Sequence, residues 1–256
     1  MARKSSPPSK LIGELTISSA ALQRRWILLS DQLRTEMQFS PEELGILPEY
    51  AANGVTAGFI GRVCDYVERN RGGVSPVAPF ARVGRGSLRS WLGFQEMWEE
   101  KASNTFIFHH VSLTVHVGYE GYSPKPQIFR SEWPGFRNWS SAEAGFQSPG
   151  AGHPHWQFDA VQTINDADKI QRERSLAKLR EEVVAEDFNL DQEDDAINAV
   201  KRIALERIHF ASAAPWWLSG TDQPYGLHMN APRDSDAITR WIVQCVAYIR
   251  QELARC

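Results

Sequence analysis

The spacing of apolar side chains changes once along this chain, near residue 105, and the change limits what the chain can fold into. Before residue 101 the large apolar residues recur at intervals of three and four, which is the spacing along one face of a helix. One such series is Leu22, Trp26, Leu29, Leu33 and Met37. From residue 105 onward apolar and polar residues alternate, as they do in a strand with one buried face. The chain therefore reads as a helical half followed by a β-rich half.

Helical spacing and capping residues predict four helices in the first half. Their ranges are 18–37, 41–50, 55–70 and 87–101. The run Ser40-Pro41-Glu42-Glu43 supports the second helix, because a capping Ser, a Pro at the first helical position and acids in the first turn favour a helix start. Ser87 is expected to cap the fourth helix.

Alternation predicts three strands in the second half, over 106–119, 127–133 and 155–162. Further helices are predicted over 166–186, 196–207 and 235–254. Short connections between consecutive strands favour an antiparallel meander. We therefore expect an α+β fold in which N-terminal helices and a C-terminal helix pack on one face of an antiparallel β-meander.

Length and composition are those of one globular domain behind a short tail. Residues 1–10, rich in Ser and Pro, predict a flexible tail, and residues 11–256 predict a single α+β domain with a helical half, 11–104, and a β-rich half, 105–256. The 28 Lys and Arg against 31 Asp and Glu give a net charge of −3, which excludes a global positive field for a polyanion. Three cysteines without a repeated pair, and no apolar run of membrane-spanning length, favour a cytoplasmic protein without membrane association.

Alternation within the first predicted strand divides its histidines between two faces. All seven histidines of the chain lie between residues 109 and 228. His110 and His116 point to one side with Ser112, and His109 points to the other side with the valines. If the valine side faces the helices, the His110 side is a polar face of the sheet.

The same alternation brings candidate catalytic and binding groups to that polar face. Arg130 and Glu132 occupy it in the second strand, and His155 and Asp159 in the third. Imidazole titrates near neutral pH and is the commonest metal ligand, so grouped histidines serve acid–base chemistry or metal binding. We take His110, His155 and Asp159 as candidate catalytic residues, and Arg130 and Glu132 as candidate binding residues.

A divalent metal ion on this face is an open alternative. Its candidate ligands are His110, His155 and Asp159, with Glu132 or His116 as further ones. No tight spacing such as His-Glu-x-x-His enforces the site, so the sequence assigns no cofactor. The simplest reading is that this face is the ordinary solvent side of an antiparallel sheet, which is polar by default.

The segment 82–89 is a candidate anion site. It places two glycines and three arginines just before the predicted helix at Ser87. Free backbone N–H groups at a helix start favour a phosphate, with Arg85 and Arg89 as partners. The alternative is a flexible loop, because a lone Gly-x-Gly is a weak signal.

Tryptophans outside the helical series are candidate recognition residues. Trp156, Trp216 and Trp217 lie at a strand end or in loops, where an exposed indole often marks a binding surface. Stacking on nucleobases beside Arg130 would give local nucleic-acid binding. The alternative is that these indoles close the edge of the core.

Motifs for covalent or phosphoryl chemistry are incomplete. Cys64 and Cys245 fall on apolar helical stripes and are predicted to be buried and inert, and no Gly-x-Ser-x-Gly elbow occurs. His110-Val111-Ser112 resembles one half of the paired His-x-Ser/Thr motif of the 2H phosphoesterases. The resemblance covers three residues and a second copy is missing, so no site of that family is carried across.

Two functions fit these patterns. The first is a non-catalytic binding or scaffold subunit of a cytoplasmic multiprotein assembly, whose Trp-rich loops and histidine-bearing sheet face contact a protein partner or a second copy of the chain. The second is a metal-dependent or histidine-based phosphodiesterase or nuclease, in which Arg130 holds a phosphate. Because no catalytic motif is complete, the binding function is the first expectation.

Overall fold

The computed structural model describes residues 15–68, 74–83, 88–119, 125–135, 155–157, 232 and 234–255. Its elements in chain order are β1 (Thr16–Ser18), α1 (Ser19–Met37), β2 (Gly45–Ala51), β3 (Gly54–Ile60), β4 (Asp65–Glu68), β5 (Val74–Arg82), β6 (Leu88–Ala102), β7 (Thr105–Tyr119), β8 (Gln127–Pro134), β9 (His155–Gln157) and α4 (Ser235–Leu253). The described part is mostly antiparallel sheet with a C-terminal helix, which confirms this part of the expected fold.

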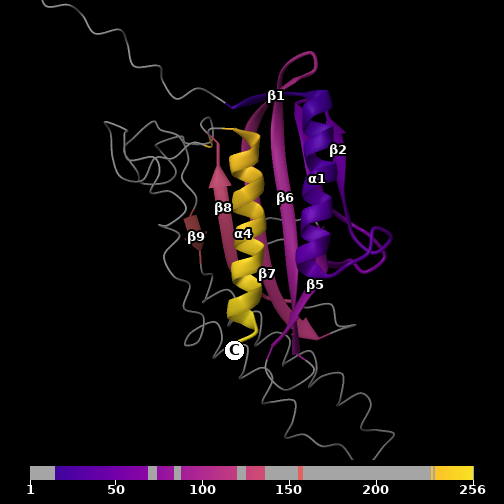
Figure 1. The fold of residues 1–256 in the computed structure, drawn as a ribbon, viewed down its shortest axis with the longest axis vertical. Coiled ribbons are helices and arrows are strands. Elements are labelled where there is room, and N and C mark those ends of the chain that lie inside the picture. Colours follow the sequence, from indigo (N-terminus) through magenta and orange to yellow (C-terminus); the bar gives the residue numbers. More distant parts are fainter. Residues whose placement is uncertain are drawn as a thin grey trace, which may run out of the picture.

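The strands form one curled sheet, a half-barrel, in the order β2-β3-β6-β7-β8-β9. The two long strands β6 and β7 pair along most of their length and form its centre. On the edge that faces away from the other long strand, each pairs with two shorter strands, one after the other along its length. β6 pairs first with β5 and then with β3, and β7 pairs first with β1 and then with β8. Figure 1 shows α1 and α4 together in front of this sheet.

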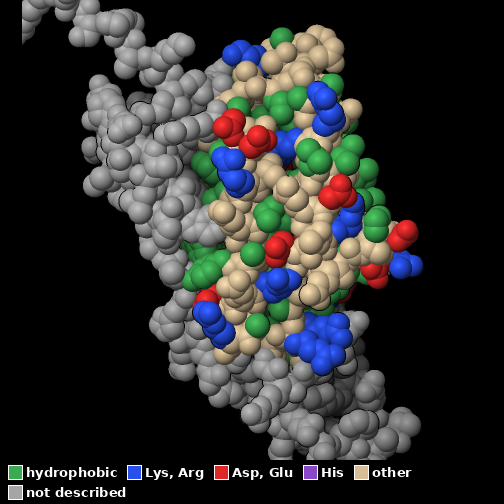
Figure 2. Space-filling view, in the orientation of Figure 1, with side chains coloured by type: hydrophobic (Ala, Val, Ile, Leu, Met, Phe, Trp, Pro, Cys, Tyr) green, Lys and Arg blue, Asp and Glu red, His purple; other side chains and the backbone are tan. Residues whose placement is uncertain are grey.

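The two helices run side by side in the same direction across one face of the sheet. Near the start of both, Arg25 of α1 donates from Nε to the carbonyl oxygen of Ser235 at 3.2 Å. Near the end of both, the Arg250 guanidinium pairs with the Glu36 carboxylate at 3.2 Å. The apolar stripe of α4 is fully buried against the sheet and comprises Ile238, Trp241, Ile242, Cys245, Ile249 and Leu253. Viewed from the helix side, charges of both signs are interspersed with apolar side chains (Figure 2).

Of the four helices predicted in the first half, only the first is confirmed, as α1. The predictions over 41–50, 55–70 and 87–101 are wrong, because these segments contain β2, then β3 and β4, and finally β6. Ser40 and Glu43 form a single turn only, in which the Ser40 N–H donates to Glu43 Oε2 at 2.8 Å. The helices predicted over 166–186 and 196–207 lie outside the described residues.

The expected strand alternation is confirmed in β7 from residue 111 to residue 117. Val111, Leu113, Val115 and Val117 are buried in the main core together with residues of both helices. The His116 side therefore faces away from the helices, as predicted.

The outer edge of β2 carries few free backbone donors. The Ile46 N–H, which points away from β3, donates to the Ser30 hydroxyl of α1 at 3.1 Å. Pro48, two residues further along the same edge, has no N–H to donate. This arrangement limits strand-to-strand association through β2.

Among the described helices, none is long and apolar enough to cross a membrane.

Candidate functional site

A β-bulge in β7 places two consecutive histidines on the face of the sheet opposite the helices. Met97 of β6 pairs with His110, and the next residue, Trp98, pairs with Phe108, so His109 has no partner in the β6 ladder. An unpaired residue of this kind shifts the alternation of side chains by one. The prediction that His109 points to the valine side is therefore wrong, and its ring lies beside that of His110.

The rings of His109 and His110 meet end to end through their Nδ1 atoms. The two nitrogens lie 3.0 Å apart. The centroids of the two rings are 5.3 Å apart. This distance is longer than the separation of the two nitrogens by about the radius of each ring. The two Nδ1 atoms therefore face each other along the line that joins the ring centres. One proton between them makes a hydrogen bond, whereas two would repel each other. His109 is half-buried, and burial lowers its pKa, although the nearby Glu99 carboxylate acts in the opposite direction.

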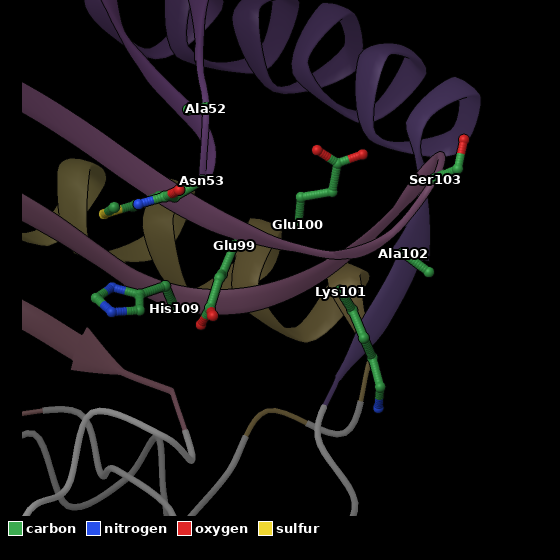
Figure 3. A pocket seen from close by; sticks show the side chains of 9 residues that line it. Ala52, Asn53, Glu99, Glu100, Lys101, Ala102, Ser103 and His109 are labelled. Atoms are coloured by element: carbon green, nitrogen blue, oxygen red, sulfur yellow. The ribbon is translucent and has the colours of Figure 1, made fainter.

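A shallow pocket of about 520 Å³ lies beside this pair, at the hairpin between β6 and β7. Its lining comprises Ala52, Asn53, Met97, Glu99, Glu100, Lys101, Ala102, Ser103 and His109. Figure 3 shows the Glu99 carboxylate and the His109 ring on the same side of the strands, whereas Glu100 points to the opposite side, toward α1. Glu99 is therefore the lining carboxylate that lies on the same side of the strands as the His109 ring.

Strand register places the other predicted residues of this face in adjacent rows. Glu132 of β8 pairs with Ser112 on one side and with His155 on the other. The Arg130 guanidinium Nε lies 3.3 Å from a Glu132 carboxylate oxygen, and both side chains are 25% exposed. We call the face formed by Met97, Glu99, His109, His110, Arg130 and Glu132 the histidine face.

The predicted triad of His110, His155 and Asp159 is only partly placed. Because β8 lies between β7 and β9, two strand spacings, about 10 Å in all, separate the backbones that carry His110 and His155. Asp159 lies outside the described residues. On the β8 side of β7, the adjacent strand therefore carries Glu132, whereas His155 lies one strand further away.

His116, a further predicted metal ligand, is buried and held at both ring nitrogens. Nδ1 lies 3.0 Å from the Lys125 carbonyl oxygen, and Nε2 lies 3.0 Å from the Thr114 hydroxyl. Burial lowers the pKa of His116 to about 4. Lys125 itself pairs with Asp65 at 2.5 Å and lies 4.8 Å from the centre of the Trp91 ring. His116 thus belongs to a closed structural cluster.

The segment that follows Ser87, which is predicted to be a helix at the expected anion site, is a strand. β6 begins at Leu88, so the described residues that follow Ser87 form a strand and not the first turn of a helix, and Arg89 lies within that strand. Arg85 lies outside the described residues. The physical argument for a phosphate at this segment therefore does not apply.

Trp156 packs toward the helices rather than onto the histidine face. Its ring contacts Phe129 and Tyr248, with centroid distances of 5.0 and 5.6 Å. This contact supports the reading in which an indole closes the edge of the core. Trp216 and Trp217 lie outside the described residues.

Met97, Glu99 and His109 are site residues that the sequence patterns missed. The helix that the sequence predicts over 87–101 includes Met97 and Glu99. Strand alternation places His109 on the valine side of the sheet, opposite to His110. One signal was present: the buried Phe108 is followed at an interval of three, and not two, by Val111, which begins the alternating series Val111, Leu113, Val115 and Val117. That interval marks the bulge.

Within the described ranges, no three His, Cys, Asp or Glu side chains are grouped closely enough to hold a metal ion.

Comparison with known proteins adds no functional information. No protein-family model matches the chain, and neither a curated protein nor a solved structure matches it significantly.

Proposed function

We propose that the protein is a non-catalytic binding subunit of a cytoplasmic multiprotein assembly, and that it contacts a protein partner through the histidine face. The observation that carries the proposal is the His109–His110 pair. A bulge holds these two polar rings, partly buried, beside Met97 and Glu99. Bulges commonly re-aim side chains at functional positions, so two adjacent imidazoles aimed at one spot favour a recognition role.

The charges of the histidine face favour a protein partner over a polyanion. Glu99 and Glu132 are acidic, and Arg130 and the neighbouring Lys101 are basic. A surface with both signs has no net field for a nucleic-acid backbone. It suits a protein surface that presents complementary charges of both signs.

Three polar groups outside the candidate catalytic residues are held by contacts within the fold. His116 is bonded at both ring nitrogens, and Arg130 is paired with Glu132. Burial raises the pKa of Cys64 to about 11, which keeps this thiol protonated at neutral pH. These contacts disfavour a catalytic role for these three groups.

Site-specific photo-crosslinking in cells of the source organism tests this function. A photo-reactive amino acid replaces Gln95 or Lys101 on the histidine-face side, and Arg24 or Gln244 on the exposed side of the helices as matched controls. We expect one defined protein adduct from the first two positions and none from the controls. Adducts from the helix side alone, or equal adducts from all four positions, would contradict the proposal.

A phosphodiesterase or nuclease is the second candidate, and the hydrogen-bonded histidine pair is the observation that favours it. A ring nitrogen that exchanges a proton with its neighbour can act as a general acid or base. Hydrolysis of a generic phosphodiester, with and without divalent metal ions, separates the two functions. Turnover that is lost on His110→Ala supports the enzyme, and absence of turnover supports the binding protein.

A further inference from the structure

We propose that His109, His110 and Met97 form a site for a soft monovalent metal ion, of which copper(I) is the biological example. The inference rests on the geometry of the two imidazole rings and on the register position of Met97 opposite His110, and it does not depend on the proposed function.

The opposed Nδ1 atoms are arranged as two ligands on either side of a single ion. They face each other along the line between the rings at 3.0 Å, with room for a proton. An ion with metal–nitrogen bonds of about 2.0 Å replaces that proton if side-chain rotation moves the nitrogens to about 4 Å apart. The displaced proton goes to solvent, both lone pairs bind the ion, and no electron is transferred.

Met97 supplies a third, soft donor from the neighbouring strand. It is the direct cross-strand partner of His110 and lines the same pocket as His109. Thioether sulfur selects copper(I) over harder ions, and imidazole also suits copper. Two imidazoles and one thioether complete the coordination of a copper(I) ion, which accepts two or three ligands.

The surroundings of the pair favour a bound cation. Glu99 faces His109, and its negative charge stabilises positive charge at that ring. Lys101 opposes a cation, but its side chain is exposed to solvent, where its charge is screened. The pocket beside His109 provides an entry path.

The test uses the full chain with the substitutions Cys64→Ala and Cys256→Ser, which leave Cys245 as the one remaining thiol. Cys245 stays, because it is fully buried. The protein is titrated without oxygen against a chromogenic copper(I) chelator, and silver(I) serves as a probe without redox chemistry. We expect one bound ion per chain. Met97→Leu and His109→Gln/His110→Gln should each weaken binding at least about 10–100-fold, the range known for loss of an outer-shell partner. Met37→Leu, in the buried face of α1, is the control and should change nothing.

X-ray absorption of the copper-loaded protein identifies the donors directly. We expect two nitrogen neighbours and one sulfur neighbour, with the sulfur lost in Met97→Leu. Unchanged affinity in His109→Gln/His110→Gln, or a sulfur neighbour retained in Met97→Leu, would overturn the proposal. Zinc(II) bound as tightly as copper(I), with no dependence on Met97, would also overturn it. If the histidine variant does not fold, the Met97→Leu results still decide.

Discussion

Arg25 of α1 and Glu96 of β6 form an ion pair between the helices and the sheet, with Nη1 and Oε1 2.5 Å apart and side chains 4% and 0% exposed. The indole N–H groups of Trp26 and Trp98 donate to the same carboxylate oxygen. Arg25 also donates to the carbonyl oxygen of Ser235 at the start of α4. One ion pair thus joins both helices to the central strand.

Removing one partner of this pair should destabilise the protein strongly. Glu96→Ala leaves the Arg25 charge buried without its partner, and we expect the free energy of unfolding to fall by about 3–5 kcal/mol. Asp31→Ala, which breaks the Arg34–Asp31 pair at the exposed surface of α1, is the control and should cost less than about 1 kcal/mol. Urea unfolding measures both. Equal losses in the two variants would contradict this role of Glu96.

Replacing both partners should recover part of the lost stability, because it removes the unpaired buried charge, although the indole N–H groups of Trp26 and Trp98 still lose their acceptor. Within the described structure, Arg25 Nη2 and Glu96 Oε2 are buried without a hydrogen-bond partner, so the pair is incompletely satisfied. Buried ion pairs of this kind are often replaceable by apolar residues of similar volume. Arg25→Met/Glu96→Leu should therefore be more stable than Glu96→Ala. A double variant that is less stable than the single one would show that the polar contacts themselves are required.

His116 should make the protein acid-sensitive. Its folded pKa of about 4 lies below the ordinary 6.5, so the stability that neutral His116 provides is fully present above pH 6.5 and is lost as pH falls toward 4. We expect this residue to account for about 2 kcal/mol of stability loss between about pH 7.5 and pH 5. The measurement is urea unfolding of the unmodified protein and of His116→Gln at each pH. The same pH dependence in both proteins would assign the effect to other groups.

Cys245 and Cys64 should resist alkylation of the native protein. Cys245 is fully buried on α4, and burial raises its pKa despite a contact with the Ser131 hydroxyl. Cys64 lies between β3 and β4, and not on the predicted helix, and is half-buried. Its pKa of about 11, against 9.0 ordinarily, reduces the thiolate fraction about 100-fold. Iodoacetamide labelling followed by mass spectrometry tests this, with the denatured protein as control. Native Cys245 that is labelled as fast as the denatured residue would contradict its burial.

The strands of the second half were predictable because only one of their faces is strongly apolar. In β7 the valines alternate with polar residues, and the predicted range, 106–119, differs from the observed Thr105–Tyr119 by one residue. The C-terminal helix was predictable for a similar reason, because its apolar residues all fall on one stripe. In both cases a single pattern was compatible with the sequence.

β6 was not predictable as a strand because it is buried on both faces. Leu92, Phe94 and Trp98 face the helices, and Trp91 packs on the opposite side with Val67 and Val77. The resulting series Trp91, Phe94 and Trp98 has the intervals of a helix although the backbone is a strand. Sequence periodicity cannot distinguish these two cases.

The candidate site was predictable in part. The polar side of β7 and the positions of Arg130 and Glu132 follow from alternation. The His109–His110 contact depends on the bulge and on the β6–β7 register, neither of which side-chain polarity determines. Met97 and Glu99 could enter the site only after β6 was known to be a strand.

The variant His109→Ala/His110→Ala tests most directly whether the histidine face is a binding site rather than a structural network. The double change removes both partners of their mutual hydrogen bond, so we expect the free energy of unfolding to change by less than about 1 kcal/mol. The measurement is the yield of the partner adduct from the photo-reactive residue at position 95, in a protein whose folding is verified by urea unfolding. The account predicts that this adduct is lost while stability is retained. An adduct that persists in the double variant, together with a loss of stability above about 2 kcal/mol, would contradict it.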